Sequence, residues 1–273
     1  MTLLSVLLQV AVVVLAMHAV CLPAVVGVDG FRGSLGRFRA NARSVAPTAV
    51  GLGVVLGVNK LVRDAGVELS WLVGANVTPT IHALEGRFVS QLQSVATPPV
   101  TTYFSFVYVF GYAFLLLFPI AIYALHDDDR PLRVALVAYS LNYLLGLVPY
   151  VLFVAYGPRN FMPELVESLL YTTWPQAQLL TGQVNANTNV FPSLHTSLAA
   201  TVAFLAYRFR SAAPRWLPLA ALLAASIAVS TMYLGIHWMT DVLAGIVLAA
   251  GSVELGLRLC DRSSREPSGC ATP

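Results

Sequence analysis

Seven long apolar segments, separated by short polar stretches, most constrain what this chain can fold into. They cover residues 2–28, 45–62, 100–125, 134–156, 193–209, 216–236 and 239–259. Each approaches the roughly 20 residues that a helix needs to cross the hydrocarbon core of a bilayer. Only 11% of the 273 residues are charged, against roughly 25% in a typical soluble domain. Too few charges remain to cover a water-facing surface of this size, so lipid must be the solvent.

The predicted fold is an all-α, polytopic membrane helical bundle of about seven transmembrane helices. A β-barrel is not expected, because the apolar segments are continuous rather than alternating. The first segment lacks the basic start of a signal peptide and exceeds its usual apolar run of ~7–15 residues, so we expect a retained helix. The predicted parts are an N-terminal pair of helices (1–62), an extracytoplasmic amphipathic and loop region (63–99), a membrane core (100–259) and a cytoplasmic tail (260–273).

Basic residues predict which way the bundle faces. Of the 16 Lys and Arg residues, 12 fall on one side if the chain crosses the membrane seven times. These are Arg32, Arg37, Arg39, Arg43, Arg130, Arg133, Arg208, Arg210, Arg215, Arg258, Arg262 and Arg265. Because basic loops stay in the cytoplasm, the N-terminus is predicted outside and the C-terminus inside a cell membrane. Two longer regions, 63–99 and 157–190, then lie on the outer side, and the second has the composition of a loop that covers a site.

An apolar stripe runs through the first of these outer regions. Ile81, Leu84, Phe88, Leu92 and Val95 recur at spacings of three and four, which places them on one face of a helix. Such a helix fits the outer membrane interface. A helix packed on neighbouring helices fits the pattern equally well.

His237 and Asp241 are the first pair with chemical meaning. A spacing of four places both side chains on one helix face, one turn apart. A carboxylate there can accept a hydrogen bond from one imidazole nitrogen and fix the tautomer, leaving the other nitrogen as a nucleophile. The pair alone fits a hydrogen-bonded structural role at the membrane interface equally well.

A second motif, Asn189-Val-Phe-Pro-Ser-Leu-His195, precedes the fifth apolar segment. Pro192 suits the first turn of a helix, with Asn189 or another nearby polar residue as its cap. Free backbone N–H groups at such a helix start favour an anion, and Ser193 adds a hydroxyl donor. His195 lies one turn further on, within reach of a bound phosphate. The predicted topology brings this motif and His237 to the same outer face, which favours a shared function for both.

Arg159 lies at the outer end of the fourth segment, on the same face as both histidines. A guanidinium there can hold phosphate oxygens by a bidentate contact. As a lone observation, Arg159 fits a lipid-headgroup anchor equally well.

The two histidine motifs together resemble those of a known family. Phe191-Pro-Ser-Leu-His195, followed by Tyr233-Leu-Gly-Ile-His-Trp-Met-Thr-Asp241, is similar to the type 2 phosphatidic acid phosphatase superfamily, and most of all to its inositol phosphorylceramide synthase-like branch. The resemblance covers roughly residues 100–259 and implies a six-helix core with its site at one membrane face. It implies that His237 attacks phosphorus, that Asp241 orients it and that His195 protonates the leaving oxygen. No metal and no cofactor is implied.

Two cationic positions of the phosphatase pattern are missing. With the arginine of the first family motif aligned on Arg159, Leu152 stands at the lysine position, and Thr231 stands at an arginine of the third motif. Pro158-Arg159 instead resembles the synthase branch, which transfers a phosphoryl-linked headgroup to an alcohol. The phosphate is then expected to be held by amides of the helix start and by other side chains. The candidates are Ser193, Arg159, Lys60, Arg63 and Arg87.

The predicted function is that of an integral-membrane lipid phosphatase or phosphotransferase with a phosphohistidine intermediate. The phosphoryl group comes from a lipid phosphate or phospho-headgroup donor and passes to water or to an alcohol such as inositol. The expected partners are this lipid and the membrane, and not nucleic acid. Two other classes stay open: a transporter with His195, His237 and Asp241 as a proton or ion path, and a metal site built from the same three residues.

Overall fold

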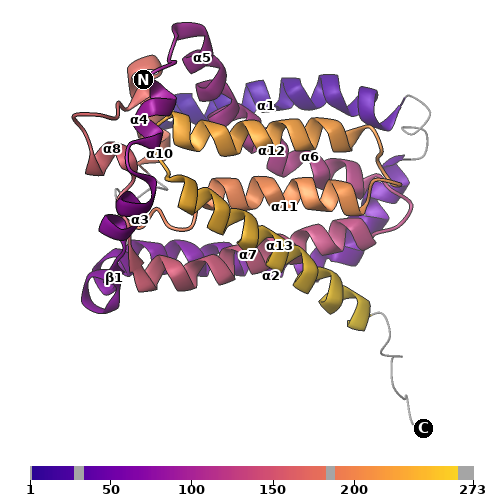
Figure 1. Cartoon of the computed structure of the whole chain (residues 1–273). Coiled ribbons are helices and arrows are strands. Elements are labelled where there is room, and N and C mark those ends of the chain that lie inside the picture. The colour runs from indigo at the N-terminus through magenta and orange to yellow at the C-terminus, as the bar shows by residue number, and fades with distance from the viewer. Residues whose placement is uncertain (1, 28–33, 183–187, 264–273) are drawn as a thin grey trace.

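The computed structural model describes residues 2–27, 34–182 and 188–263 (Figure 1). Its long helices are α1 (Leu3–Val26), α2 (Ser34–Val73), α5 (Pro98–Phe106) continued by the π-helical η2 (Val107–Gly111) and α6 (Tyr112–Ala124), α7 (Arg130–Leu152), α11 (Leu194–Arg208), α12 (Trp216–Tyr233) and α13 (Met239–Ser263). Its short elements are β1 (Ala75–Asn76), α3 (Thr78–Glu85), α4 (Phe88–Gln93), β2 (Phe153–Val154), α8 (Pro158–Phe161), α9 (Leu169–Thr173) and α10 (Ala177–Thr181). Within these residues the only strands are β1 and β2, which pair in parallel. The predicted all-α fold is confirmed.

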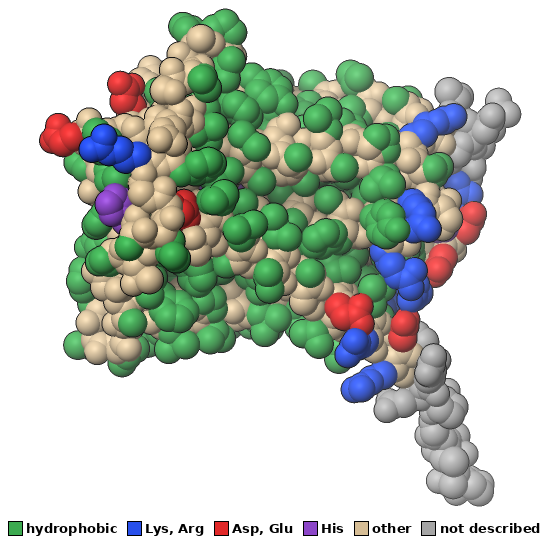
Figure 2. Space-filling model, in the orientation of Figure 1, with side chains coloured by type: hydrophobic (Ala, Val, Ile, Leu, Met, Phe, Trp, Pro, Cys, Tyr) green, Lys and Arg blue, Asp and Glu red, His purple; other side chains and the backbone are tan. Residues whose placement is uncertain are grey.

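The bundle has the dimensions and composition of a membrane domain. In the described part of the chain, six helical stretches are long and apolar enough to cross a bilayer. The helix of the fifth predicted segment, α11, has 15 residues, or about 22 Å at the helical rise per residue. It contacts α6, α7, α12 and α13. Figure 2 shows a wide apolar surface, with most visible Lys and Arg side chains gathered at the end where α13 finishes. The chain is a multi-pass membrane protein.

Several residues used in the sequence predictions lie outside the described residues. They are Arg32 and Arg265, which entered the topology prediction, residues 183–187 of the predicted outer loop, and residues 264–273 of the predicted tail.

Helix α2 extends well beyond the predicted segment 45–62, from Ser34 to Val73. Its polar first turns lowered the hydropathy there, but they are held by tertiary contacts. The side-chain amide of Asn41, for example, donates to the backbone carbonyl of Ala124 at 3.1 Å. Hydropathy therefore predicted the apolar middle of α2 and missed both ends.

The single amphipathic helix predicted within 63–99 is wrong. The structure has two short helices, α3 and α4, which separate at Gly86, where φ is +56°. This break rotates the apolar residues out of one stripe. Ile81 and Val89 are buried and join the cluster around Trp238, whereas Leu84 is 76% exposed. Of the two predicted environments, the membrane interface and packing on neighbouring helices, the structure supports packing for Ile81 and Val89.

Helices α11 and α13 cross closely near their N-termini, and this crossing positions the two histidine motifs. At Gly245 in α13, an added Cβ would lie 2.6 Å from the carbonyl oxygen of Ser193 and 3.3 Å from the amide nitrogen of Ser197. Only a residue without a side chain allows this approach. On its other side α11 is held by Asn142 of α7, whose amide donates to the hydroxyls of Ser197 (2.7 Å) and Thr201 (3.0 Å).

We expect Gly245→Ala to destabilise the protein, because the new methyl group must push α13 away from α11. The loss should be about 1–3 kcal/mol, the usual cost of overpacking, and thermal unfolding in detergent would measure it. Gly251→Ala is the matched control, because an added Cβ at Gly251 meets nothing within 4 Å and alanine favours the helix. Equal melting temperatures for the two variants would contradict the close crossing.

Candidate functional site

His237 and Asp241 form a hydrogen-bonded pair at the start of α13. Nδ1 of His237 lies 3.2 Å from Oδ2 of Asp241, and the same carboxylate oxygen accepts the backbone N–H of Trp238 at 2.9 Å. Asp241 is fully buried, and His237 is 6% exposed. Because a carboxylate is an acceptor, Nδ1 is the protonated nitrogen, and Nε2 keeps its lone pair. The predicted pairing is present, but the shared helix face is wrong, because α13 begins at Met239 and His237 lies in the turn before it.

The turn before this pair is built around Gly235, which has a φ of +73°. After it, the backbone N–H groups of Ile236 and His237 both donate to the carbonyl oxygen of Thr231 at 3.0 Å. The positive φ allows the chain to leave α12 and enter α13 within a few residues. His237 is thereby fixed through its backbone as well as through its ring.

The N-terminus of α13 is held by a residue that the sequence analysis did not single out. Glu85, at the end of α3, accepts the backbone N–H of Met239 at 2.8 Å and that of Thr240 at 2.6 Å, one with each carboxylate oxygen. These are first-turn donors that the helix itself cannot satisfy. Trp238, fully buried, donates its indole N–H to the carbonyl of Tyr156 at 2.8 Å. Helix α3 and the chain that follows β2 therefore both hold the start of α13.

Ser193 caps α11, and this differs from the predicted arrangement. The helix begins at Leu194, so Pro192 precedes the cap instead of lying in the first turn, and Asn189 is not the cap. The Ser193 hydroxyl accepts the amide of Thr196 at 3.3 Å and donates to the Thr196 hydroxyl at 3.0 Å. Ser193 is fully buried and does not line the cavity described below. Its contact with phosphate stays a prediction.

His195 is held between aromatic rings at the start of α11. Its ring stacks on Tyr108 with centroids 4.6 Å apart and lies 4.4 Å from the ring centroid of Tyr112. The aromatic contacts fix the plane of the imidazole. His195 and His237 line the same cavity, so the two histidines share one site.

Arg159 approaches the same site from α8. Its backbone N–H donates to the carbonyl of Gly235 at 3.0 Å, next to His237. The guanidinium lies over the ring of Tyr171 at 4.7 Å, and Nη2 donates to the Tyr171 hydroxyl at 3.2 Å. Nη1 is buried and has no hydrogen-bond partner in the described part of the chain. A buried N–H donor without a partner is costly, so this atom is suited to meet an anion.

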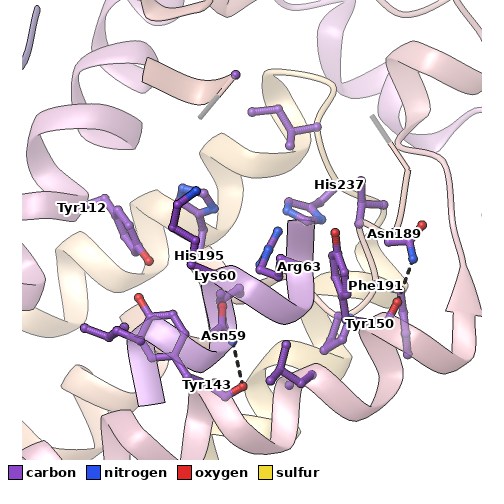
Figure 3. A pocket seen from close by; sticks show the side chains of 18 of the residues that line it. Asn59, Lys60, Arg63, Tyr112, Tyr143, Tyr150, Asn189, Phe191, His195 and His237 are labelled. Atoms are coloured by element: carbon purple, nitrogen blue, oxygen red, sulfur yellow. Dashed lines mark hydrogen bonds between the residues drawn. The ribbon is translucent and has the colours of Figure 1, made fainter. Parts of the chain in front are cut away.

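One cavity of about 550 Å³ connects these groups (Figure 3). His195, His237 and Arg159 line it, and α2 contributes Lys60 and Arg63. Arg87, the other cation considered from the sequence, is not among its lining residues. The lining also includes Asn59, Tyr112, Tyr143, Tyr150, Asn160 and Asn189. The sequence did not assign these polar residues to a pocket, because no local pattern marks residues that meet only in the folded bundle.

No metal cluster accompanies the two histidines. Within residues 2–27, 34–182 and 188–263, no group of three or more His, Cys, Asp or Glu residues could hold a metal ion. None of the described residues that line the cavity is acidic, because Asp241 lies behind His237. The arrangement is a cationic pocket with two imidazoles, which suits an anionic ligand. The triad gathers at one end of the bundle, and nothing in the described residues supports an ion path through its middle.

Comparison with known families gives one match. The model described as the PAP2 superfamily matches residues 82–255, nearly two thirds of the chain. The matched region contains Arg159, His195, His237 and Asp241, and it excludes α1 and α2. No curated protein and no solved structure matches the chain.

We expect Glu85→Ala to destabilise the protein, because two helix-start N–H groups lose a charged acceptor. Hydrogen bonds to charged groups contribute about 1.5–3 kcal/mol, and thermal unfolding would detect such a loss. Glu164→Ala is the control, since Glu164 is an exposed carboxylate that makes no contact of this kind. If both variants melt at the wild-type temperature, Glu85 does not hold α13.

Proposed function

The chain belongs to the PAP2 superfamily, the type 2 phosphatidic acid phosphatases, and on that premise we propose that it transfers phosphoryl groups from lipids through a phosphohistidine intermediate. Family membership and the membrane helices already give a membrane lipid phosphatase-type function. The observation that carries the finer proposal is the cavity, where the Asp241-paired ring of His237 meets His195 and the partnerless Nη1 of Arg159.

In the first step, Nε2 of His237 attacks the phosphorus of a lipid phosphate or phospho-headgroup. A P–N bond forms, and the P–O bond to the leaving group breaks. The negative charge of the bound phosphate favours a protonated His195, which then gives its proton to the leaving oxygen. Asp241 keeps the proton of His237 on Nδ1 and stabilises the positive charge that develops on the ring. Arg159 and, in this proposal, Ser193 with the amides of the α11 start hold the phosphate oxygens.

In the second step, His195 is the base. It takes a proton from water or from an alcohol, whose oxygen attacks phosphorus while the P–N bond breaks and His237 is released. Water as acceptor makes a phosphatase, and an alcohol such as inositol makes a phosphotransferase. We favour the inositol phosphorylceramide synthase-like branch, because Leu152 and Thr231 stand where the phosphatase pattern has cations and Pro158-Arg159 follows the synthase pattern.

We further propose a cell-membrane protein with its N-terminus outside, its C-terminus in the cytoplasm and its site on the extracytoplasmic face. The distribution of basic side chains in Figure 2 supports this orientation, because most that are visible lie at the end opposite the site. In this arrangement residues 1–62 are an N-terminal helix pair beside the core 100–259, residues 63–99 are the outer region, and the tail from 260 is cytoplasmic.

We expect His237→Ala to abolish turnover and Asp241→Asn to slow it by about 10⁴-fold. This is the loss of kcat seen when the carboxylate that fixes the histidine tautomer in a serine protease is replaced by an amide. Phosphate release and headgroup transfer, followed by mass spectrometry of lipids with and without inositol, would measure activity and identify donor and acceptor. Melting curves must show that both variants fold. A folded His237→Ala variant that still consumes lipid phosphates would refute the mechanism.

We expect His195→Ala to accumulate the intermediate when the donor is a phosphate monoester with a good leaving group, because the first step then needs no proton and the second lacks its base. Rapid quench at alkaline pH and mass spectrometry should find 80 Da, about the mass of one HPO₃ group, on His237. The same analysis of the doubly substituted His195→Ala, His237→Ala protein is the control. A phosphorylated residue elsewhere would assign the nucleophile to a different side chain.

A further inference from the structure

One face of α2 forms a wall of the cavity. Leu56, Asn59, Lys60 and Arg63 all line it. The last three follow Leu56 by three, four and seven residues, which places all four on one side of a helix. Figure 3 shows Lys60 and Arg63 projecting into the same space as His195 and His237. This helix lies outside residues 82–255, which match the family. A segment beyond the recognised core therefore contributes to the site.

The wall is fixed in place by contacts with the core. The amide of Asn59 donates to the carbonyl of Tyr143 at 3.2 Å, and the guanidinium of Arg63 lies 4.5 Å from the ring centroid of Tyr150. Further along α2, the Ser70 hydroxyl accepts the amide of Asn189 at 2.7 Å. These contacts join α2 to α7 and to the segment that leads into α11, so the position of Lys60 and Arg63 relative to the histidines is defined.

Lys60 and Arg63 bring positive charge to a core that lacks two cations of the phosphatase pattern. Leu152, at one missing cationic position, is 48% exposed at the end of α7. Thr231, at the other, is fully buried, and its hydroxyl donates to the carbonyl of Ala228 at 2.8 Å. Among the described lining residues the cations are Lys60, Arg63 and Arg159, so two of the three come from α2.

The apolar end of the same face reaches the surface of the bundle. Leu56, one turn before Lys60, lines the cavity and is 41% exposed. In a membrane-spanning helix that exposed surface meets lipid, because no water is present at that depth. The face therefore runs from a lipid-facing leucine to two cations beside the histidines. An amphiphile with an anionic head and a hydrocarbon chain has the same order of groups.

We propose that this face of α2 is a substrate-binding surface, which holds the phosphate of a lipid with Lys60 and Arg63 and leads its chain into the bilayer past Leu56. This inference rests on the proposed lipid phosphoryl transfer, and it assigns to α2 both phosphate binding and the path of the chain.

The charged part of the surface is tested with Lys60→Gln and Arg63→Gln. Each removes a charge-assisted contact, so kcat/KM should fall about 10- to 100-fold for both dioleoyl phosphatidate and glycerol 3-phosphate, which share the same phosphate. Arg87→Gln is the control, an equal change of charge at an exposed residue away from the cavity. If neither α2 variant loses more than Arg87→Gln, the cations of α2 do not bind phosphate.

The apolar part is tested with Leu56→Trp, whose larger side chain blocks the path of the chain. The kcat/KM for dioleoyl phosphatidate should fall about tenfold more than the kcat/KM for glycerol 3-phosphate. Val54→Trp is the control, because Val54 is 60% exposed on the same helix but does not line the cavity. An equal substrate ratio in the two variants would overturn the chain path.

Binding separates this proposal from the proposed chemistry. In a His237→Ala background, dissociation constants of both ligands for protein in nanodiscs are expected to change with the α2 variants as kcat/KM does. If Lys60→Gln and Arg63→Gln weaken the binding, the proposed substrate-binding face of α2 is supported even where the wild type consumes neither ligand. In that case only the proposed phosphoryl transfer would be refuted. Binding that none of the α2 variants alters, with turnover intact, would overturn the surface alone.

Discussion

The site depends on one constraint: the segments that leave and enter helices at this end of the bundle must pair their buried backbone N–H and C=O groups. They do so by bonding to one another. The amide of Ser193 donates to the carbonyl of Asp241 at 3.0 Å, and the amide of Val190 donates to that of Ala155 at 3.0 Å. These bonds join the segment before α11 to the start of α13 and to the chain after α7. The distance between the two histidine motifs is thus set by main-chain hydrogen bonds, which vary little, rather than by flexible side chains.

The lining of the cavity concentrates positive side chains at this end of the bundle. The guanidinium groups of Arg63 and Arg159 each lie on a tyrosine ring, at 4.5 Å and 4.7 Å. An aromatic face attracts a cation without neutralising it, so these ring contacts hold the guanidinium groups and leave their charge in place. The buried carboxylate of Asp241 is directed at His237 and does not line the cavity. The carboxylate of Asp241 thus orients the imidazole of His237, while the positive side chains line the cavity.

The sequence predicted those parts that depend on local periodicity. Seven apolar segments were recognised because their length alone demands lipid, and His237 and Asp241 were paired because a spacing of four defines a helix face. Parts that depend on tertiary contact could not be read in this way. Glu85 meets Met239 across 154 residues, and no pattern in α3 marks it as the cap of another helix. The break at Gly86 was missed, since a stripe of apolar residues has the same spacing whether or not the helix continues.

Helix α2 shows why a family core and a complete site need not coincide. The residues that change covalent bonds in the proposed mechanism must keep a strict mutual geometry, and all of them lie in the matched region. Residues that bind an anion need only bring charge to within a few ångströms, since Coulomb attraction weakens gradually with distance. A cation lost from α7 or α12 can therefore be replaced from any helix that borders the cavity. The helix α2 does border it, and its packing on α7 through Asn59 and Tyr143 brings Lys60 and Arg63 to that border.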